Sequence, residues 1–330
     1  MKQNIIIYGA SDKGKEAYKF LVRTYNVVYF CAYDESKAGS FVKGIKVLST
    51  NQLLKYRDYK VIIVSPNYDE IVYELFSSGI YNIEVFDKKY YIENWKTLRE
   101  VKQGPQFLGI GAQKSGTTWL YENLRIHPEL YLPNIKELHY FNKSISRNIN
   151  YWKFFEGNNR LKGEITPAYG ILSYERIKYI KKILPNLKII LLLRNPIDRA
   201  WSHTIMHFTK FEKRSINEVS EREIINFMRS YDCIMRSNYL HIINNWKSVY
   251  PESQIFIGMY EDIERNPQKL LNDIFKFLGV KQQYDFTNFP YDKIIFNGEY
   301  AGIPSQYKKE LHALYSLFLE QLNNCGISFT

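Results

Sequence analysis

The feature that most constrains the fold is a short apolar segment that leads into a loop of small and hydroxyl residues and then into a helix. Residues 107–111 (FLGIG) form the apolar segment, and residues 112–118 (AQKSGTT) form the loop. A short apolar run bounded by turn residues predicts a buried strand, and a buried strand followed by a helix is typical of a parallel sheet. We therefore expect an α/β fold with this loop at one edge of the sheet.

The loop has the composition of an anion-binding site. Gly116, and Gly111 just before the loop, let the backbone approach ligand oxygens, and Ser115, Thr117 and Thr118 offer hydroxyl donors. Lys114 adds a full positive charge. The helix that follows points its free N–H groups at the same place. Together these features predict a site for a phosphate-like group.

The order of residues in the loop differs from that of a Walker loop. Lys114 precedes Gly116, whereas the Walker lysine follows the last glycine. A second apolar run, residues 187–193, ends in Arg194 rather than in the aspartate that holds magnesium in P-loop enzymes. A cation there repels magnesium and attracts a second phosphate. A P-loop kinase or NTPase remains an alternative, which dependence on ATP and magnesium would reveal.

Residues 113–118 (QKSGTT) resemble the 5′-phosphosulfate loop of sulfotransferases that use 3′-phosphoadenosine 5′-phosphosulfate (PAPS). The resemblance extends over residues 105–325 and implies a parallel-sheet, P-loop-like sulfotransferase domain. The family pattern also implies that Arg194 and Ser202 bind the 3′-phosphate of the donor. It implies donor contacts from the loop and the start of its helix, namely from Lys114, Ser115, Gly116, Thr117, Thr118 and Trp119.

Residues 133–141 (PNIKELHYF) resemble the Lys-Glu-x-His-Phe-Phe segment of heparan-type carbohydrate sulfotransferases. The resemblance implies that Glu137 is the general base that takes the acceptor's proton, while Lys114 stabilises the leaving group. His139 is the second choice for the base, and we expect it to act mainly as a structural hydrogen-bonding group.

Two segments depart from the family pattern. Residues 163–169 (GEITPAY) carry Ile165 where several carbohydrate enzymes have a lysine, and Glu164 beside it is a candidate substrate contact. The basic Gly-Arg loop of the family corresponds here to residues 297–300 (NGEY), which contain no arginine. Some contacts to donor or acceptor must therefore differ.

The first hundred residues alternate strand and helix signals, which predicts a Rossmann-like α/β module over residues 1–100 before a sulfotransferase domain over residues 101–330. Gly9, Gly14 and Asp34 have the layout of a dinucleotide-binding fingerprint. Ser11 replaces the middle glycine, so a module that binds no dinucleotide is the alternative. Every sulfotransferase motif follows residue 106, and we expect the module to be dispensable for the chemistry.

Charge and composition narrow the function classes. The net charge of +11 divides into +3 over residues 1–100 and +8 over residues 101–330, which suits an anionic small-molecule donor. The three scattered cysteines fit a reducing compartment and favour neither a disulfide framework nor a zinc site. His203 and His207 have a spacing that could bind zinc but no third ligand nearby, so we expect no metal. The apolar runs are far shorter than the ~20 residues of a membrane span.

These observations predict a bacterial, cytoplasmic PAPS-dependent sulfotransferase in polysaccharide biosynthesis. It would move a sulfuryl group to a hydroxyl or amine of a carbohydrate or glycoconjugate and release adenosine 3′,5′-bisphosphate. We expect no nucleic-acid partner. A catalytically inactive nucleotide-binding module is the remaining alternative, and it would bind adenosine 3′,5′-bisphosphate without transferring sulfate.

Overall fold

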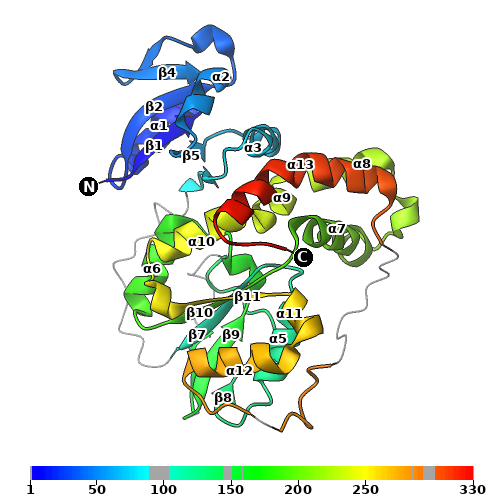
Figure 1. Ribbon diagram of the computed structural model, residues 1–330. Coiled ribbons are helices and arrows are strands. Elements are labelled where there is room, and N and C mark those ends of the chain that lie inside the picture. The colour runs from blue at the N-terminus through cyan, green and yellow to red at the C-terminus, as the bar shows by residue number, and fades with distance from the viewer. Residues whose placement is uncertain are drawn as a thin grey trace. The chain divides into compact units, whose positions relative to one another are not determined.

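The structure is a computed structural model that describes residues 2–88, 104–143, 151–157, 159–283, 285–292 and 302–329 (Figure 1). The chain forms two compact units, each with its own largely parallel sheet. The predicted α/β class with parallel sheets is confirmed in both. The described part of the chain contains no helix that is long and apolar enough to cross a membrane.

The first unit contains a six-stranded sheet in the order β3-β4-β2-β1-β5-β6. All neighbouring strands are parallel except β3 and β4, which pair antiparallel. The central strands are apolar on both faces because helices cover both sides of a parallel sheet. The strands are β1 (Asn4–Tyr8), β2 (Asn26–Ala32), β3 (Phe41–Val42), β4 (Ile45–Ser49), β5 (Lys60–Ile63) and β6 (Ile83–Val85).

Two later segments of the chain belong to the same unit. It joins the residues up to 88 to Glu221–His241 and Lys309–Ser328. The ring of Phe318 lies 5.0 Å from that of Phe76 and 4.8 Å from that of Tyr81, centroid to centroid. The C-terminal helix thus completes the core of the N-terminal module. The helices of the unit are α1 (Asp12–Leu21), α2 (Thr50–Leu53), α3 (Tyr68–Ser77), α8 (Glu221–Met228), α9 (Tyr231–Ser237) and most of α13 (Ser305–Asn324).

The sequence did not anticipate this sharing of segments. The predicted boundary between residues 100 and 101 lies outside the described residues. Helix α10 (Tyr239–Lys247) begins in the first unit and continues into the second.

The second unit contains a five-stranded sheet in the order β11-β10-β7-β9-β8, and every neighbouring pair is parallel. Figure 1 shows α5 and α12 against this sheet. Their apolar side chains form one core with Phe107 of β7 and with Ile190 and Leu192 of β10. The strands are β7 (Phe107–Gly111), β8 (Leu130–Tyr131), β9 (Leu161–Ile165), β10 (Lys188–Leu193) and β11 (Ile255–Met259). The helices are α5 (Thr117–Leu124), α6 (Tyr174–Ile183), α7 (Pro196–Met206), α11 (Glu261–Arg265) and α12 (Pro267–Leu278).

The parallel arrangement brings the ends of four strands to one edge. The loops after β7, β10, β11 and β9 all leave the sheet at its carboxyl edge, where ligands of open α/β sheets bind. Asn195 caps α7, because its Oδ1 accepts the backbone N–H of Ile197 at 3.0 Å. Gly279 ends α12 with a φ of +80°.

Candidate active site

The loop after β7 is tightly constrained at Gly116. This residue has a φ of +79°, which favours glycine, and an added Cβ would lie 2.2 Å from Cδ1 of Ile263. Lys114 is also left-handed, with a φ of +70°. Helix α5 begins at Thr117, directly after Gly116, so its first backbone N–H groups face the loop.

Two buried polar atoms of the loop are unsatisfied within the described part of the chain. Ser115 is fully buried and its Oγ has no hydrogen-bond partner there. The Oε1 of Gln113 is likewise buried and without a partner. Buried polar atoms are nearly always hydrogen-bonded in native proteins, so these two fit a ligand with donor and acceptor groups.

Arg194 connects the loop after β10 to the loop after β7. Its Nη1 donates to the backbone carbonyl of Lys114 at 3.1 Å. Its guanidinium lies 4.4 Å from the ring centroid of Tyr260, the residue that follows β11. The two residues that the sequence assigned to the two phosphates of the donor are therefore neighbours.

The loop lies in a cluster of positive charges. Burial, together with the charges of four neighbouring cations, lowers the pKa of Lys114 to about 8; these cations are Arg194, Lys210, Arg199 and Lys136. Like charges gathered in this way favour an anionic ligand, which relieves their repulsion. Sequence reasoning missed Lys210, because it lies in a π-helical turn, His207–Phe211, that carries no motif.

Glu137 lies between two basic side chains. The Nζ of Lys136 is 3.3 Å from Glu137 Oε1, and the Nε2 of His139 is 3.2 Å from Oε2. The other ring nitrogen of His139 is 3.2 Å from Oδ1 of Asn142. Burial alone would raise the pKa of Glu137, but the hydrogen bond from His139 and the charge of Lys136 hold this pKa below its usual value. The carboxylate is thus ionised at neutral pH.

The other predicted site residues lie on the helices that follow the two loops. Thr117 and Thr118 occupy the first turn of α5, and half-buried Ser202 lies within α7. Trp119 is 4% exposed, belongs to the core of the second unit, and donates its Nε1–H to the carbonyl of Tyr291 at 2.8 Å. Its packing role is visible, and its donor contact stays a prediction.

We expected Glu164 to be a candidate substrate contact, but its side chain is buried. It is 2% exposed in β9, and its carboxyl group accepts hydrogen bonds from the hydroxyls of Tyr151, Thr166 and Tyr169. Residues 297–300, which correspond to the basic loop of the family, lie outside the described residues.

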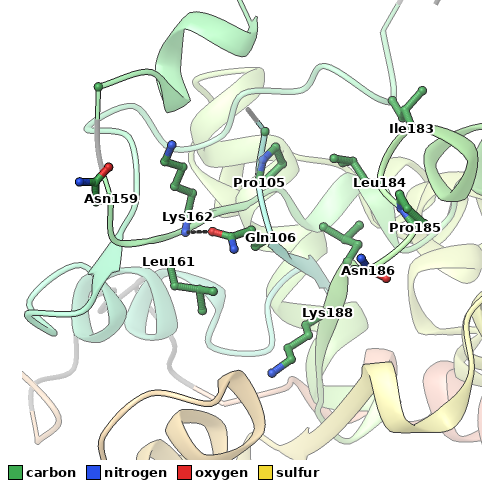
Figure 2. A pocket seen from close by; sticks show the side chains of 13 residues that line it. Pro105, Gln106, Asn159, Leu161, Lys162, Ile183, Leu184, Pro185, Asn186 and Lys188 are labelled. Atoms are coloured by element: carbon green, nitrogen blue, oxygen red, sulfur yellow. Dashed lines mark hydrogen bonds between the residues drawn. The ribbon is translucent and has the colours of Figure 1, made fainter. Parts of the chain in front are cut away.

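A cavity of about 560 Å³ lies at the opposite edge of the same sheet (Figure 2). It is lined by Gln106 before β7, Lys162 in β9 and Lys188 at the start of β10. Figure 2 shows Gln106 beside Lys162, whose backbone N–H donates to Gln106 Oε1 at 3.1 Å. The Nζ of Lys188 donates to the last carbonyls of α12 at 2.7 and 2.8 Å. Because these residues lie at the amino ends of the strands, the cavity is separate from the cationic loops at the carboxyl edge.

No group of three or more His, Cys, Asp and Glu side chains in the described ranges could hold a metal ion. His207, one of the two histidines with zinc-like spacing, instead has its Nε2 3.0 Å from Oε1 of Glu212.

The sequence pattern of the sulfotransferase domain matches residues 105–289, which include both cationic loops and Glu137. The chain belongs to the sulfotransferase family. It accordingly contains a sulfotransferase domain with the P-loop-like α/β fold. Residues 1–86 match a second pattern, described as C2185-like, N-terminal.

Curated relatives resemble the sulfotransferase part of the chain. A bifunctional heparan sulfate N-deacetylase/N-sulfotransferase 4 from Mus musculus is 28% identical over 221 residues, which are 61% of this chain and 25% of the relative. The membrane-associated sulfotransferase kil1 from Dictyostelium discoideum is 36% identical over 130 residues, 37% of this chain and 27% of the relative. The matched region thus spans about a quarter of the length of these relatives.

A solved sulfotransferase from Alicyclobacillus acidocaldarius shares the fold. It superposes with a TM-score of 0.53 at 22% identity and covers 68% of this chain and 97% of its own.

Proposed function

We propose that this sulfotransferase moves a sulfuryl group from PAPS to a hydroxyl or amine of a carbohydrate or glycoconjugate. One observation carries the proposal. Lys136 lies 3.3 Å from the carboxylate of Glu137, and its charge also lowers the pKa of Lys114 in the anion loop. These two interactions of Lys136 support a single site that contains the anion loop and an ionised carboxylate. The heparan sulfate enzymes among the relatives support a carbohydrate acceptor.

The donor would be held by the two loops at the carboxyl edge of the sheet. Ser115 has an unpartnered buried hydroxyl and the loop leads into the N-terminus of α5, which suits the 5′-phosphosulfate. Arg194 and Ser202 take the 3′-phosphate in this proposal. The donor's two anionic ends would then relieve the repulsion among the cations around Lys114.

The chain's own groups can perform the transfer without a metal. The acceptor oxygen or nitrogen attacks sulfur and its proton passes to the carboxylate of Glu137. The bond between sulfur and the bridging oxygen breaks, and Lys114 neutralises the charge that develops on that oxygen. His139, hydrogen-bonded to Glu137, holds the carboxylate in place. The products are the sulfated acceptor and adenosine 3′,5′-bisphosphate.

The role of Glu137 is tested by Glu137→Gln, which keeps the size of the side chain but removes the proton acceptor. Turnover should fall roughly 10²–10⁴-fold, the usual scale for loss of a general base. The Kd of adenosine 3′,5′-bisphosphate should stay within about threefold, because Glu137 does not hold the nucleotide. Glu252→Gln, at an exposed carboxylate paired with Lys247, is the matched control.

The comparison with His139→Ala decides between two bases. We expect this variant to lose less turnover than Glu137→Gln. If His139→Ala is the more severe and Glu137→Gln stays active, histidine is the base and the carbohydrate assignment loses its residue-level support.

The reaction itself is tested by mass spectrometry of products from PAPS and a panel of sugars, glycolipids and nucleotide-linked sugars. A mass gain of one sulfuryl group identifies the acceptor. Binding of adenosine 3′,5′-bisphosphate without any transfer across the panel would favour the inactive nucleotide-binding module. Turnover that requires ATP and magnesium would favour a kinase or NTPase.

A further inference from the structure

The side chain of Glu164 is buried near the carboxyl end of β9. It accepts a short hydrogen bond from the hydroxyl of Tyr151 and bonds from Tyr169 at 3.1 Å and Thr166 at 2.9 Å. Glu164 and Thr166 lie at the carboxyl end of β9, while the two tyrosines come from the short 3-10 helices Tyr151–Phe155 and Pro167–Tyr169. Three separate elements thus converge on one carboxylate that is 2% exposed.

Tyr169 connects this hydrogen-bond network to the segment that carries Glu137 and His139. Its hydroxyl accepts the backbone N–H of Tyr140 at 2.9 Å and that of Phe141 at 3.4 Å. A tyrosine hydroxyl has one proton and two lone pairs. Because the proton goes to Glu164, the lone pairs are turned toward the two N–H groups that directly follow His139.

The aromatic rings of Tyr151 and Tyr169 also pack against the residues that follow His139. Tyr140 stacks on Tyr151 with 4.1 Å between ring centroids and 6° between ring planes. Phe141 meets the edge of Tyr169 at a centroid distance of 5.4 Å. The backbone after His139 is therefore held by the hydrogen bonds to Tyr169 and by the rings of Tyr151 and Tyr169.

We propose that Glu164 is a positioning residue that, through the hydroxyl of Tyr169, fixes the backbone after His139 and so the placement of Glu137 for proton transfer. The inference rests on the proposed function in that it takes Glu137 as the base. Glu164 itself touches neither donor nor acceptor in this proposal, since its carboxyl group is enclosed by three hydroxyls.

The ionised form of Glu164 is the form that orients Tyr169. Burial raises the pKa of Glu164 to about 7, although the hydroxyls of Tyr151, Thr166 and Tyr169 and the charge of His139 oppose the rise. Protonated Glu164 carries a proton of its own, so one of the three hydroxyls that donate to it must turn away. Turnover should therefore decline as the pH falls below about 7, independently of donor binding.

Tyr169→Phe is the mildest test, because it keeps the ring that packs on Phe141 and removes only the hydroxyl. We expect kcat to fall on the order of 10–100-fold, the scale of a small misplacement of a catalytic group. The Kd of adenosine 3′,5′-bisphosphate should stay within about threefold. Tyr250→Phe is the matched control: its buried hydroxyl donates to the carbonyl of Leu184 at 3.1 Å, so its loss should lower stability without lowering kcat.

Glu164→Gln tests the origin of the effect. It should lower kcat to a similar extent and abolish the decline of kcat below pH 7. Because Glu164 acts through Tyr169, the double variant should be no worse than the more severe single variant. Losses that multiply in the double variant, or a wild-type kcat profile that is flat between pH 6 and 8, would overturn the inference.

Glu137→Gln in the same assay separates this inference from the proposed function. If Glu137→Gln is inactive while Tyr169→Phe and Glu164→Gln retain full kcat, the positioning role is wrong and the base stands. If Glu137→Gln is active, the base itself is wrong, whatever the other variants do.

Discussion

The charge of Lys114 should make donor binding depend on pH in an unusual range. Burial and four neighbouring cations lower the pKa of this ammonium group to about 8. An ordinary lysine stays charged to above pH 10. The free protein should therefore lose the central positive charge of the anion loop between pH 7 and pH 9, and an anionic nucleotide should restore it by binding to the charged form.

The size of the effect follows from the pKa. With a pKa of about 8, roughly nine tenths of Lys114 is protonated at pH 7 and roughly one tenth at pH 9. If only the charged form binds well, the Kd of adenosine 3′,5′-bisphosphate rises about tenfold over this range, or about 1.4 kcal/mol. The phosphates of the ligand contribute little to the change, because their second pKa is about 6.

Isothermal titration calorimetry at pH 7, 8 and 9 in two buffers of different ionisation enthalpy would measure both the Kd and the proton uptake. Lys114→Arg is the control, since its guanidinium does not titrate in this range and its Kd should be flat. Lys114→Ala should bind weakly at every pH and lose turnover. A wild-type Kd that is equally flat from pH 7 to 9 would refute the reasoning.

Three further changes have defined outcomes. Arg194→Ala should weaken adenosine 3′,5′-bisphosphate by ~1.5–3 kcal/mol, the scale of a charged hydrogen bond, and should barely affect a ligand without the 3′-phosphate; calorimetry that finds equal losses contradicts the 3′-phosphate assignment. Folding raises the pKa of Glu164 from 4.5 to about 7, so the folded protein holds a proton there that the unfolded chain releases. As the pH rises through this window, the free energy of unfolding of the wild type should fall by about 3 kcal/mol relative to that of Glu164→Gln. Urea unfolding at pH 4.5 and 7.5 measures the difference, and an equal difference at both pH values argues against a buried, titrating carboxyl. A chain truncated to begin at Gly104 should lose cooperative thermal unfolding, because Phe318 of α13 packs on Phe76; a sharp transition would show that α13 folds without the module.

The sequence predicted the elements whose local signals are strong. The apolar runs at residues 107–111 and 187–193 are buried on both faces of a sheet, and the structure has strands β7 and β10 there within one residue. The anion loop could be recognised from the order of its residues alone.

The rest depends on contacts between distant residues. Glu164 has no local feature that distinguishes a buried hydrogen-bonded carboxylate from an exposed one, since its partner Tyr151 lies thirteen residues away. The left-handed backbone of Lys114 is imposed by the surrounding fold, because lysine rarely adopts it. The packing of α13 on residues before 88 is likewise invisible in the sequence, because Phe318 and Phe76 lie more than two hundred residues apart.

The shared core of the first unit bears on how the chain folds during synthesis. The strands of that unit are complete by residue 88, but α13 reaches its end only at Asn324. At about 5–20 residues per second, the intervening stretch takes roughly 12–47 s to translate. Throughout that time Phe76 and Tyr81 lack the ring of Phe318, which packs against them in the folded unit. The nascent module therefore leaves the ribosome with part of its apolar core uncovered, and its need for chaperones should depend on how fast the roughly 236 codons from residue 88 to residue 324 are read.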